Sequence, residues 1–295
     1  MTQIERGPGA GREDGSVLRV DFVAHRQPRA SAGATWAGAN WSSPVAVGRN
    51  GRVRLHPQRD VWMVEPDGPL DELADDLDHS VQCALAEFPR AVVCNVPGQL
   101  SRLSWATLDT LAAVGRHAQV WPETPVVMVS RDPRADDLVG RRKNGRHLHF
   151  ASSLLSAWTH VMFQRPWFEA RMSLAASPTA PRAARRFLAQ ACEEWQVRAC
   201  TALGELVVSE LATNALRHTG TDLEVLLASD GEGVLRVGVR DRVGVPPSTR
   251  TVPADSLGGR GLHIVETVSR CAGALPTADG GKVVWATVTP GDSLS

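Results

Sequence analysis

The hydrophobic and polar positions divide the chain into three stretches with different patterns. Residues 1–44 are rich in Gly, Ala, Arg and Ser without a sustained period, which predicts a disordered leader with a weakly signalled strand at 17–23. From residue 45 to about 162, short apolar runs alternate with amphipathic stretches. These runs predict strands at 61–64, 91–96 and 125–130 and helices at 70–88, 105–118 and 152–161. Strands separated by helices indicate an α/β layer domain at 45–162.

The third stretch, residues 168–290, predicts a second α/β domain. Ser177 followed by Pro178 signals the start of a helix, and a second helix is expected at 205–218. Strands are expected at 169–175 on a sheet edge, at 223–228 and 234–241 in a hairpin, and at 282–288. A last helix is expected after the Gly-rich turn that begins at Gly258. Its inward-facing residues would be Leu262, Val265, Val268 and Ala272. The inward-facing apolar residues of these helices and strands all lie within this stretch. We therefore expect it to fold by itself, as helices on one mixed sheet.

Length, charge and cysteine content narrow the class of protein. The 295 residues are enough for two domains that each bury a core. Lys plus Arg and Asp plus Glu both number 32, so no overall field favours nucleic acid or an anionic membrane. The five cysteines lack metal-like spacing, which predicts free thiols in a reducing compartment. Without a long apolar run or a secretory leader in the sequence, we expect a cytoplasmic protein.

Two polar side chains on the helix at 205–218 are the first candidates for a functional site. At 100° per residue, Leu203, Leu206 and Val207 define an apolar arc, and Glu210 and Asn214 fall inside it, one turn apart on one face. An inward carboxylate and amide are costly unless something satisfies them. Either the face looks into a cleft that holds a polar ligand, or both groups bond to neighbouring backbone.

Two further pieces point to a nucleotide. Period-two alternation places Asp241 at the end of a core-facing strand row, and residues 258–261 form a Gly-rich turn before a helix. Such a turn presents backbone N–H groups and the positive end of the helix dipole to an anion. An amide oxygen suits Mg²⁺, a buried carboxylate can accept from an adenine amine, and a second carboxylate can orient an attacking hydroxyl. Together the pieces describe an ATP site.

In order and spacing these pieces resemble the GHKL, or Bergerat-fold, ATPases, and most closely the serine kinases that act as anti-sigma factors. The motifs are SELATNALRH at 209–218, VRDRVGVPP at 239–247 and GGRGLHIVETV at 258–268. The resemblance implies that Asn214 binds Mg²⁺, that Glu210 is the catalytic carboxylate and that Asp241 recognises adenine. The ATP-binding residues that it implies are Asn214, Asp241, Gly244, Gly259, Arg260, Gly261 and Leu262. For His218 and Arg260, beside the motifs, two roles stay open: contact with a phosphate or a partner, and a solvated position at the rim of the site.

The adenine motif departs from the family pattern. The family has Asp-x-Gly-x-Gly, whereas Val243 and Val245 replace both glycines here and Gly244 lies between them. The expected activity is that of an ATP-dependent protein serine/threonine kinase acting on an anti-sigma-factor antagonist, with a sigma factor as a further partner and a homodimer as an alternative assembly. A non-catalytic, ATP-responsive module that sequesters a transcription regulator is the second hypothesis. A sensor histidine kinase is the third, with His160 as the best-placed acceptor but without an acidic neighbour.

The earlier α/β stretch resembles the STAS domain of anti-sigma-factor antagonists, through the segment PRAVVCNVPGQLSRLSWATLDTLAAV at 89–114. In that family a strand ends in an Asp-Ser-Ser-Gly-like turn that opens a helix, and one serine accepts phosphate. The matching turn here runs from Ser104 to Thr107, with Ala106 at the acceptor position. Since a helix start favours Ser or Thr for capping, we expect capping rather than phosphorylation at this turn.

Overall fold

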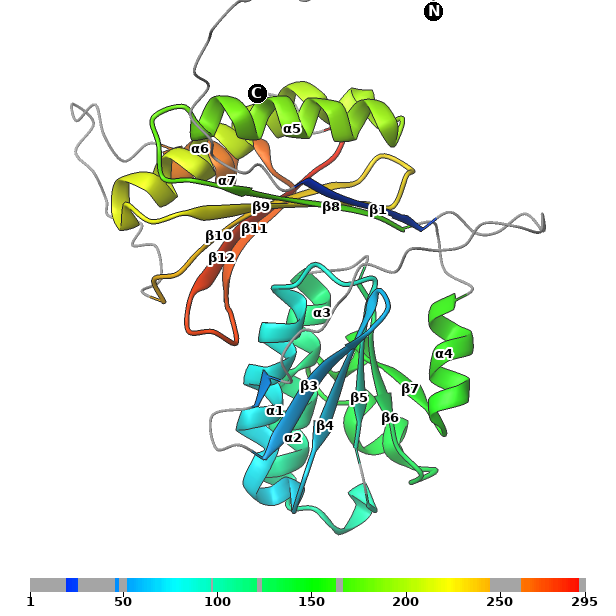
Figure 1. Cartoon of the computed structure of the whole chain (residues 1–295). Coiled ribbons are helices and arrows are strands. Elements are labelled where there is room, and N and C mark those ends of the chain that lie inside the picture. Colours follow the sequence, from blue (N-terminus) through cyan, green and yellow to red (C-terminus); the bar gives the residue numbers. More distant parts are fainter. Residues whose placement is uncertain are drawn as a thin grey trace, which may run out of the picture.

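The computed structural model describes residues 20–25, 46–47, 52–96, 98–120, 124–162, 167–244 and 261–291, and its elements form two six-stranded sheets with helices packed on them (Figure 1). The expected mixed α/β fold class is therefore confirmed. Each sheet has its own helical layer, and the two sheets meet through a buried interface.

The first sheet is mixed, in the order β2-β3-β4-β5-β6-β7. Its strands are β2 (Ala46–Val47), β3 (Val53–Gln58), β4 (Val61–Pro66), β5 (Ala91–Asn95), β6 (Val126–Val129) and β7 (His149–Ala151). Neighbours from β2 to β4 are antiparallel, and those from β4 to β7 are parallel. The helices are α1 (Leu70–Leu85), α2 (Trp105–Ala113), α3 (Gly115–Val120) and α4 (Leu154–Met162).

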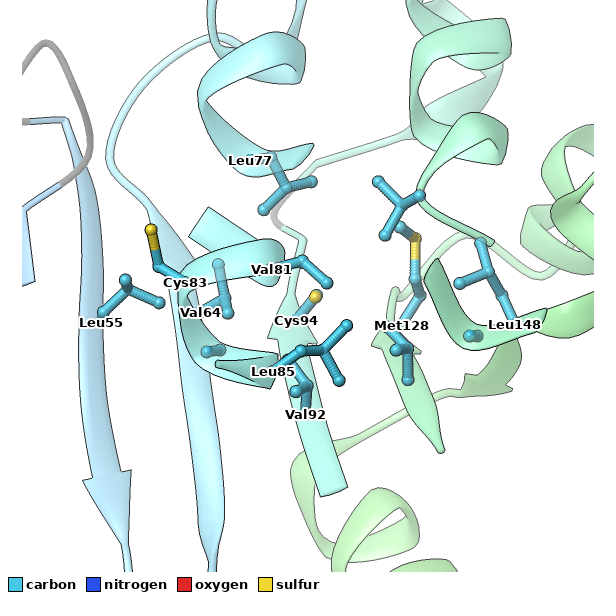
Figure 2. Close-up of a cluster of buried hydrophobic side chains, with 14 of the residues drawn as sticks. Leu55, Val64, Leu77, Val81, Cys83, Leu85, Val92, Cys94, Met128 and Leu148 are labelled. Atoms are coloured by element: carbon cyan, nitrogen blue, oxygen red, sulfur yellow. The ribbon is translucent and has the colours of Figure 1, made fainter. Parts of the chain in front are cut away.

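Helices on both faces explain why the central strands of this sheet are continuously apolar. Successive strand residues point to opposite faces, so Val92 and Cys94 meet α1 while Ala91 and Val93 meet α4. Figure 2 shows the α1 side, where Leu77, Val81 and Leu85 lie against side chains of β4, β5 and β6. The strands predicted at 61–64, 91–96 and 125–130 are confirmed as β4, β5 and β6.

The single helix predicted at 105–118 is wrong, because it divides into α2 and α3 around Val114. Gly115 sits where the backbone of Asn144 approaches, and a Cβ there would stand 2.0 Å from the Asn144 carbonyl oxygen. Tertiary contact therefore sets the break. The strands β2, β3 and β7 of this sheet were not predicted, and β7 is only three residues long.

The second sheet has the order β1-β8-β9-β10-β12-β11, with antiparallel pairing between all neighbours, so the expected mixed sheet is wrong. Its strands are β1 (Val20–His25), β8 (Trp167–Leu174), β9 (Leu223–Ser229), β10 (Leu235–Asp241), β11 (Cys271–Pro276) and β12 (Lys282–Val288). One face is covered by α5 (Ala180–Glu194), α6 (Thr201–Thr219) and α7 (Gly261–Val268) (Figure 1).

Three boundary predictions in this part need correction. Strand β8 is not an edge strand, because β1 pairs along it. Helix α5 begins at Ala180 rather than near Ser177, whose Oγ lies 3.0 Å from Thr179 Oγ1 instead of capping an N–H. The last helix ends at Val268, and Ala272 lies in β11, where pairing with β12 overrides the helical spacing. The predicted hairpin of β9 and β10, and the predicted strand β12, are confirmed.

The first domain covers the face of the second sheet that lies opposite α5, α6 and α7 (Figure 1). Trp167, Leu226, Val283 and Trp285 on this face belong to the same buried apolar cluster as Phe88, which follows α1. The expectation that residues 168–290 fold alone considered only the apolar residues on the face of the sheet that the helices cover. An isolated second domain would expose this second apolar face to water.

A buried carboxylate at this interface makes stability depend on pH. Glu169 on β8 is 7 % exposed, and burial raises the pKa of its carboxyl to about 7. The positive charge of Arg171 acts to lower this pKa, and the negative charges of Asp60 and Glu87 act to raise it. The folded state therefore holds a proton at pH 5 to 7 that the unfolded chain releases. As the pH rises through this range, the folded protein loses the stability that this proton provides.

We therefore expect Glu169→Gln to become more stable relative to wild type as the pH rises from 5 to 8, by about 2 to 3 kcal/mol in the free energy of unfolding. Urea unfolding at several pH values measures this difference. Glu266→Gln, which changes an exposed carboxylate on α7, is the control and should follow the wild-type curve. Parallel curves for wild type and Glu169→Gln would contradict the prediction.

Candidate functional site

Helix α6 places Glu210 and Asn214 at the border of its buried face. The fully buried positions of the helix are Gly204, Val207, Val208, Leu211, Ala212 and Ala215. Glu210 and Asn214 are half-buried and lie one turn apart, beside the partly buried Leu206. The prediction that both side chains fall inside the apolar arc is therefore wrong. They lie at the margin of the arc, where solvent can reach them.

The Glu210 carboxylate lies against the first residue of α7. A Cβ built on Gly261 would stand 2.5 Å from Glu210 Oε2, so a larger residue at 261 would displace the carboxylate from its place. The negative carboxylate thus meets the positive end of a helix dipole. The following residue, Leu262, is partly buried and packs on the core beneath α6. Two of the sequence motifs, distant along the chain, therefore meet in space.

Asp241 ends β10 as predicted, on the core-facing row and only 3 % exposed. Its Oδ1 accepts hydrogen bonds from the Val243 N–H at 2.9 Å and from Lys282 Nζ at 2.9 Å. Lys282, itself buried, also donates to the Val243 carbonyl oxygen at 2.7 Å. The lysine therefore compensates the charge of the carboxylate and fixes the backbone of the residue that replaces the first family glycine.

Lys282 is not among the predicted site residues, although its position in the sequence indicates a buried partner for Asp241. Lys282 opens a largely apolar strand, and period-two alternation places it in the inward row with Val284 and Ala286. In the register of β10 with β12 it stands directly opposite Asp241. An inward lysine opposite an inward aspartate predicts a buried ion pair.

The backbone after β10 runs close to the turn between β11 and β12. A Cβ on Gly244 would stand 2.5 Å from the carbonyl oxygen of Gly280, and one on Gly281 would stand 2.2 Å from the carbonyl oxygen of Asp241. Glycine is therefore needed at 244 although valine precedes it. The predicted site residues Gly259 and Arg260, and Val245 of the adenine motif, lie outside the described residues.

Asp241 also lines a groove of about 550 Å³ at the ends of β8, β9 and β10. Polar, charged and small or apolar side chains line the groove: Ser173, Leu174, Ala175, Ser177, Thr179, Ala180, Ala183, Asp222, Leu223, Glu224, Arg240, Asp241, Arg242 and Asp279. Glu210 and Asn214 do not border this groove, so the described site has two parts. His218 is exposed on α6, which agrees with a solvated position at the rim of the site.

Two general properties bear on the site. Among the helices that the structure describes, none combines the length and the apolarity that a membrane crossing requires. The five cysteines are free thiols, as expected, and Cys94 and Cys192 are among those that are buried.

Comparison with known families finds a similarity in the second α/β part of the chain. Residues 174–288 match the family model of the histidine kinase-like ATPase domain, which spans the region from the end of β8 to β12. This segment is less than half of the chain, so the similarity applies to the segment and not to the whole chain. No curated protein matches the chain. Residues 174–288 are therefore similar to histidine kinase-like ATPase domains, a class whose members bind ATP, usually with Mg²⁺.

Proposed function

We propose that the histidine kinase-like ATPase domain at residues 174–288 binds ATP with Mg²⁺ and directs its γ-phosphoryl group to a serine or threonine hydroxyl of a partner protein. The observation that carries the proposal is the contact of the Glu210 carboxylate with Gly261 at the start of α7. A catalytic carboxylate must stand beside the phosphate-binding turn, and this contact supports that arrangement.

The residues present fit an adenine nucleotide. Asp241 is buried, its Oδ1 is engaged by Lys282 and Val243, and its carboxylate borders a groove of sufficient size for a base. A carboxylate acceptor at this place suits the exocyclic amine of adenine. Asn214 offers one amide oxygen to Mg²⁺, whose other ligands would be phosphate oxygens and water. Gly261 keeps the backbone at the start of α7 free of side chains.

The chemistry asked of the protein is positioning and proton transfer. ATP supplies the phosphoryl group, and Glu210 orients the substrate hydroxyl or accepts its proton. The half-buried position of Glu210, at the margin of α6, supports access for a hydroxyl of another protein. The carboxylate lies beside Gly261, the first residue of α7.

The partner-switching role is the finer part of the proposal. We propose a cytoplasmic anti-sigma-factor kinase whose substrate is an antagonist with a STAS domain, and a degenerate STAS-like domain at 45–162. In that domain Ser104 caps α2, with its Oγ accepting from the Thr107 N–H at 3.1 Å, and Thr107 Oγ1 donates to Asp71. Both hydroxyls are thus engaged in the helix start, which supports a turn that is capped and not phosphorylated.

A binding module remains the second candidate, and one observation favours it. Lys282 already compensates the Asp241 carboxylate, so part of the capacity of this residue to hold adenine is used within the protein. In such a module ATP would change only the surface that holds a transcription regulator.

Incubation with γ-labelled ATP and a panel of STAS-domain antagonist proteins tests the function. The kinase predicts Mg²⁺-dependent label on serine or threonine of one antagonist, stable to acid. Label that acid removes, on His160 or on a partner histidine, would favour a histidine kinase instead. ATP binding without transfer to any antagonist would favour the binding module.

A further inference from the structure

The two domains meet at a corner of the first domain that is inserted against the second sheet. This corner, residues 86–88, follows α1 and precedes β5. Phe88 has a φ of 54°, a left-handed conformation that is uncommon for an aromatic residue, and it is 1 % exposed. Its ring lies against Gly238 of β10, where a Cβ would stand 2.5 Å from Phe88 Cζ. Packing against the second sheet therefore holds the corner in a strained backbone conformation.

Glu87, beside Phe88, binds two arginines of the second sheet. Its Oε2 accepts from Arg171 Nη1 on β8 at 2.9 Å, and its Oε1 accepts from Arg240 Nη1 on β10 at 2.9 Å. Arg171 Nη2 also donates to the Glu87 carbonyl oxygen at 2.5 Å. All three side chains are largely buried, with exposed fractions of 11 to 20 %. In such a setting an ion pair is screened little, so loss of one partner is felt by the other.

Arg240 connects this ion pair to the nucleotide side of the sheet. Its Nη2 lies 3.1 Å from Asp279 Oδ1, in the turn between β11 and β12, and Thr277 Oγ1 donates to the same oxygen. This turn contacts Gly244 and the Asp241 backbone, and Lys282 directly follows it. Arg240, Asp241 and Asp279 all line the groove. A continuous chain of contacts therefore leads from Glu87 to the candidate adenine site.

We propose that Glu87 of the first domain is a positioning residue for the nucleotide site, so that the state of the first domain sets nucleotide affinity. Glu87 holds Arg240 toward Asp279 and thereby fixes the turn at 277–281 against Asp241. Without Glu87, Arg240 is divided between Glu224 and Asp279, and the turn loses its fixed partner. The inference rests on the proposed ATP site for its affinity readout alone.

Amide hydrogen exchange without nucleotide tests the positioning directly. The amides of Val243, Thr277 and Gly280 are bonded within the site and its turn. Glu87→Gln and Arg240→Gln should each speed exchange at these amides by roughly 5- to 20-fold, in the lower part of the usual range for coupling between sites. Arg171→Gln is the matched control, because it removes the other ion pair of Glu87 and leaves the route to the turn intact. Unchanged exchange in both test variants would overturn the proposal.

ATP affinity by calorimetry gives the second readout. Glu87→Gln and Arg240→Gln should each weaken ATP binding by roughly 5- to 20-fold, and the double variant should be no weaker than the worse single one, because both act on one path. Arg171→Gln should stay within about twofold. Altered exchange with unaltered ATP affinity, or equal losses in all three single variants, would refute a positioning role. If wild type binds no ATP but exchange responds as expected, the ATP site fails and the positioning by Glu87 stands.

Discussion

Replacing Glu210 with glutamine should lower phosphoryl transfer to a partner protein by about 10²- to 10⁴-fold, while ATP affinity changes little. Glutamine keeps the size of the side chain and its contact with Gly261 but cannot accept a proton. The two quantities must be measured on the same variant, as the single-turnover transfer rate and the dissociation constant for ATP. Such a separation is the mark of a group that acts in the transition state rather than in binding.

The control for this variant is Glu205→Gln on the same helix, a half-buried carboxylate one and a half turns before Glu210. It should transfer at the wild-type rate. Equal transfer by wild type and Glu210→Gln would remove Glu210 from catalysis. Absence of transfer from wild type, with ATP bound, would leave the binding module as the better account of the domain.

Asn214→Ala should weaken Mg²⁺-dependent ATP binding by about 100-fold or more. Even residues that only support a metal ligand typically contribute 10- to 100-fold to metal affinity, and Asn214 is proposed as a direct ligand. Loss of its amide oxygen leaves the charge of the phosphates less compensated. Calorimetry with ATP, in the presence of Mg²⁺ and of EDTA, measures both the loss and its dependence on the metal.

Thr213→Ala is the matched control, because Thr213 is the exposed neighbour of Asn214 on α6. It should bind ATP as wild type does. If Asn214→Ala bound ATP with unchanged affinity in Mg²⁺, the amide would have no role as a metal ligand. A loss of equal size in EDTA would instead point to a contact of Asn214 with the nucleotide itself.

Local patterns were sufficient for the elements that carry the candidate site. Alternation along β10 placed Asp241 on the inward row, and its burial follows from that row. The helical period of α6 placed Glu210 and Asn214 on one side of the helix, although it did not distinguish the centre of the buried face from its margin. That distinction depends on where α7 packs, and α7 follows far along the chain.

The interface between the domains could not be predicted in the same way. Glu87 pairs with Arg240, which is 153 positions away, and no local period links the two residues. Trp167 and Trp285 face the first domain, and alternation along their strands does not reveal what covers this second face of the sheet. The helix predicted at 70–88 included Phe88, but α1 ends at Leu85 and Phe88 has a left-handed conformation.

Strand β1 has a consequence for biosynthesis. It lies before the first domain in the sequence but pairs with β8, which follows that domain. About 140 residues separate the two strands, so at usual rates of translation the ribosome takes roughly 7 to 28 s to make the partner of β1. During that interval the α/β domain between them can fold while β1 waits unpaired. Until β8 has been made, the Val20–His25 segment of the nascent chain therefore lacks the strand that it pairs with in the folded protein.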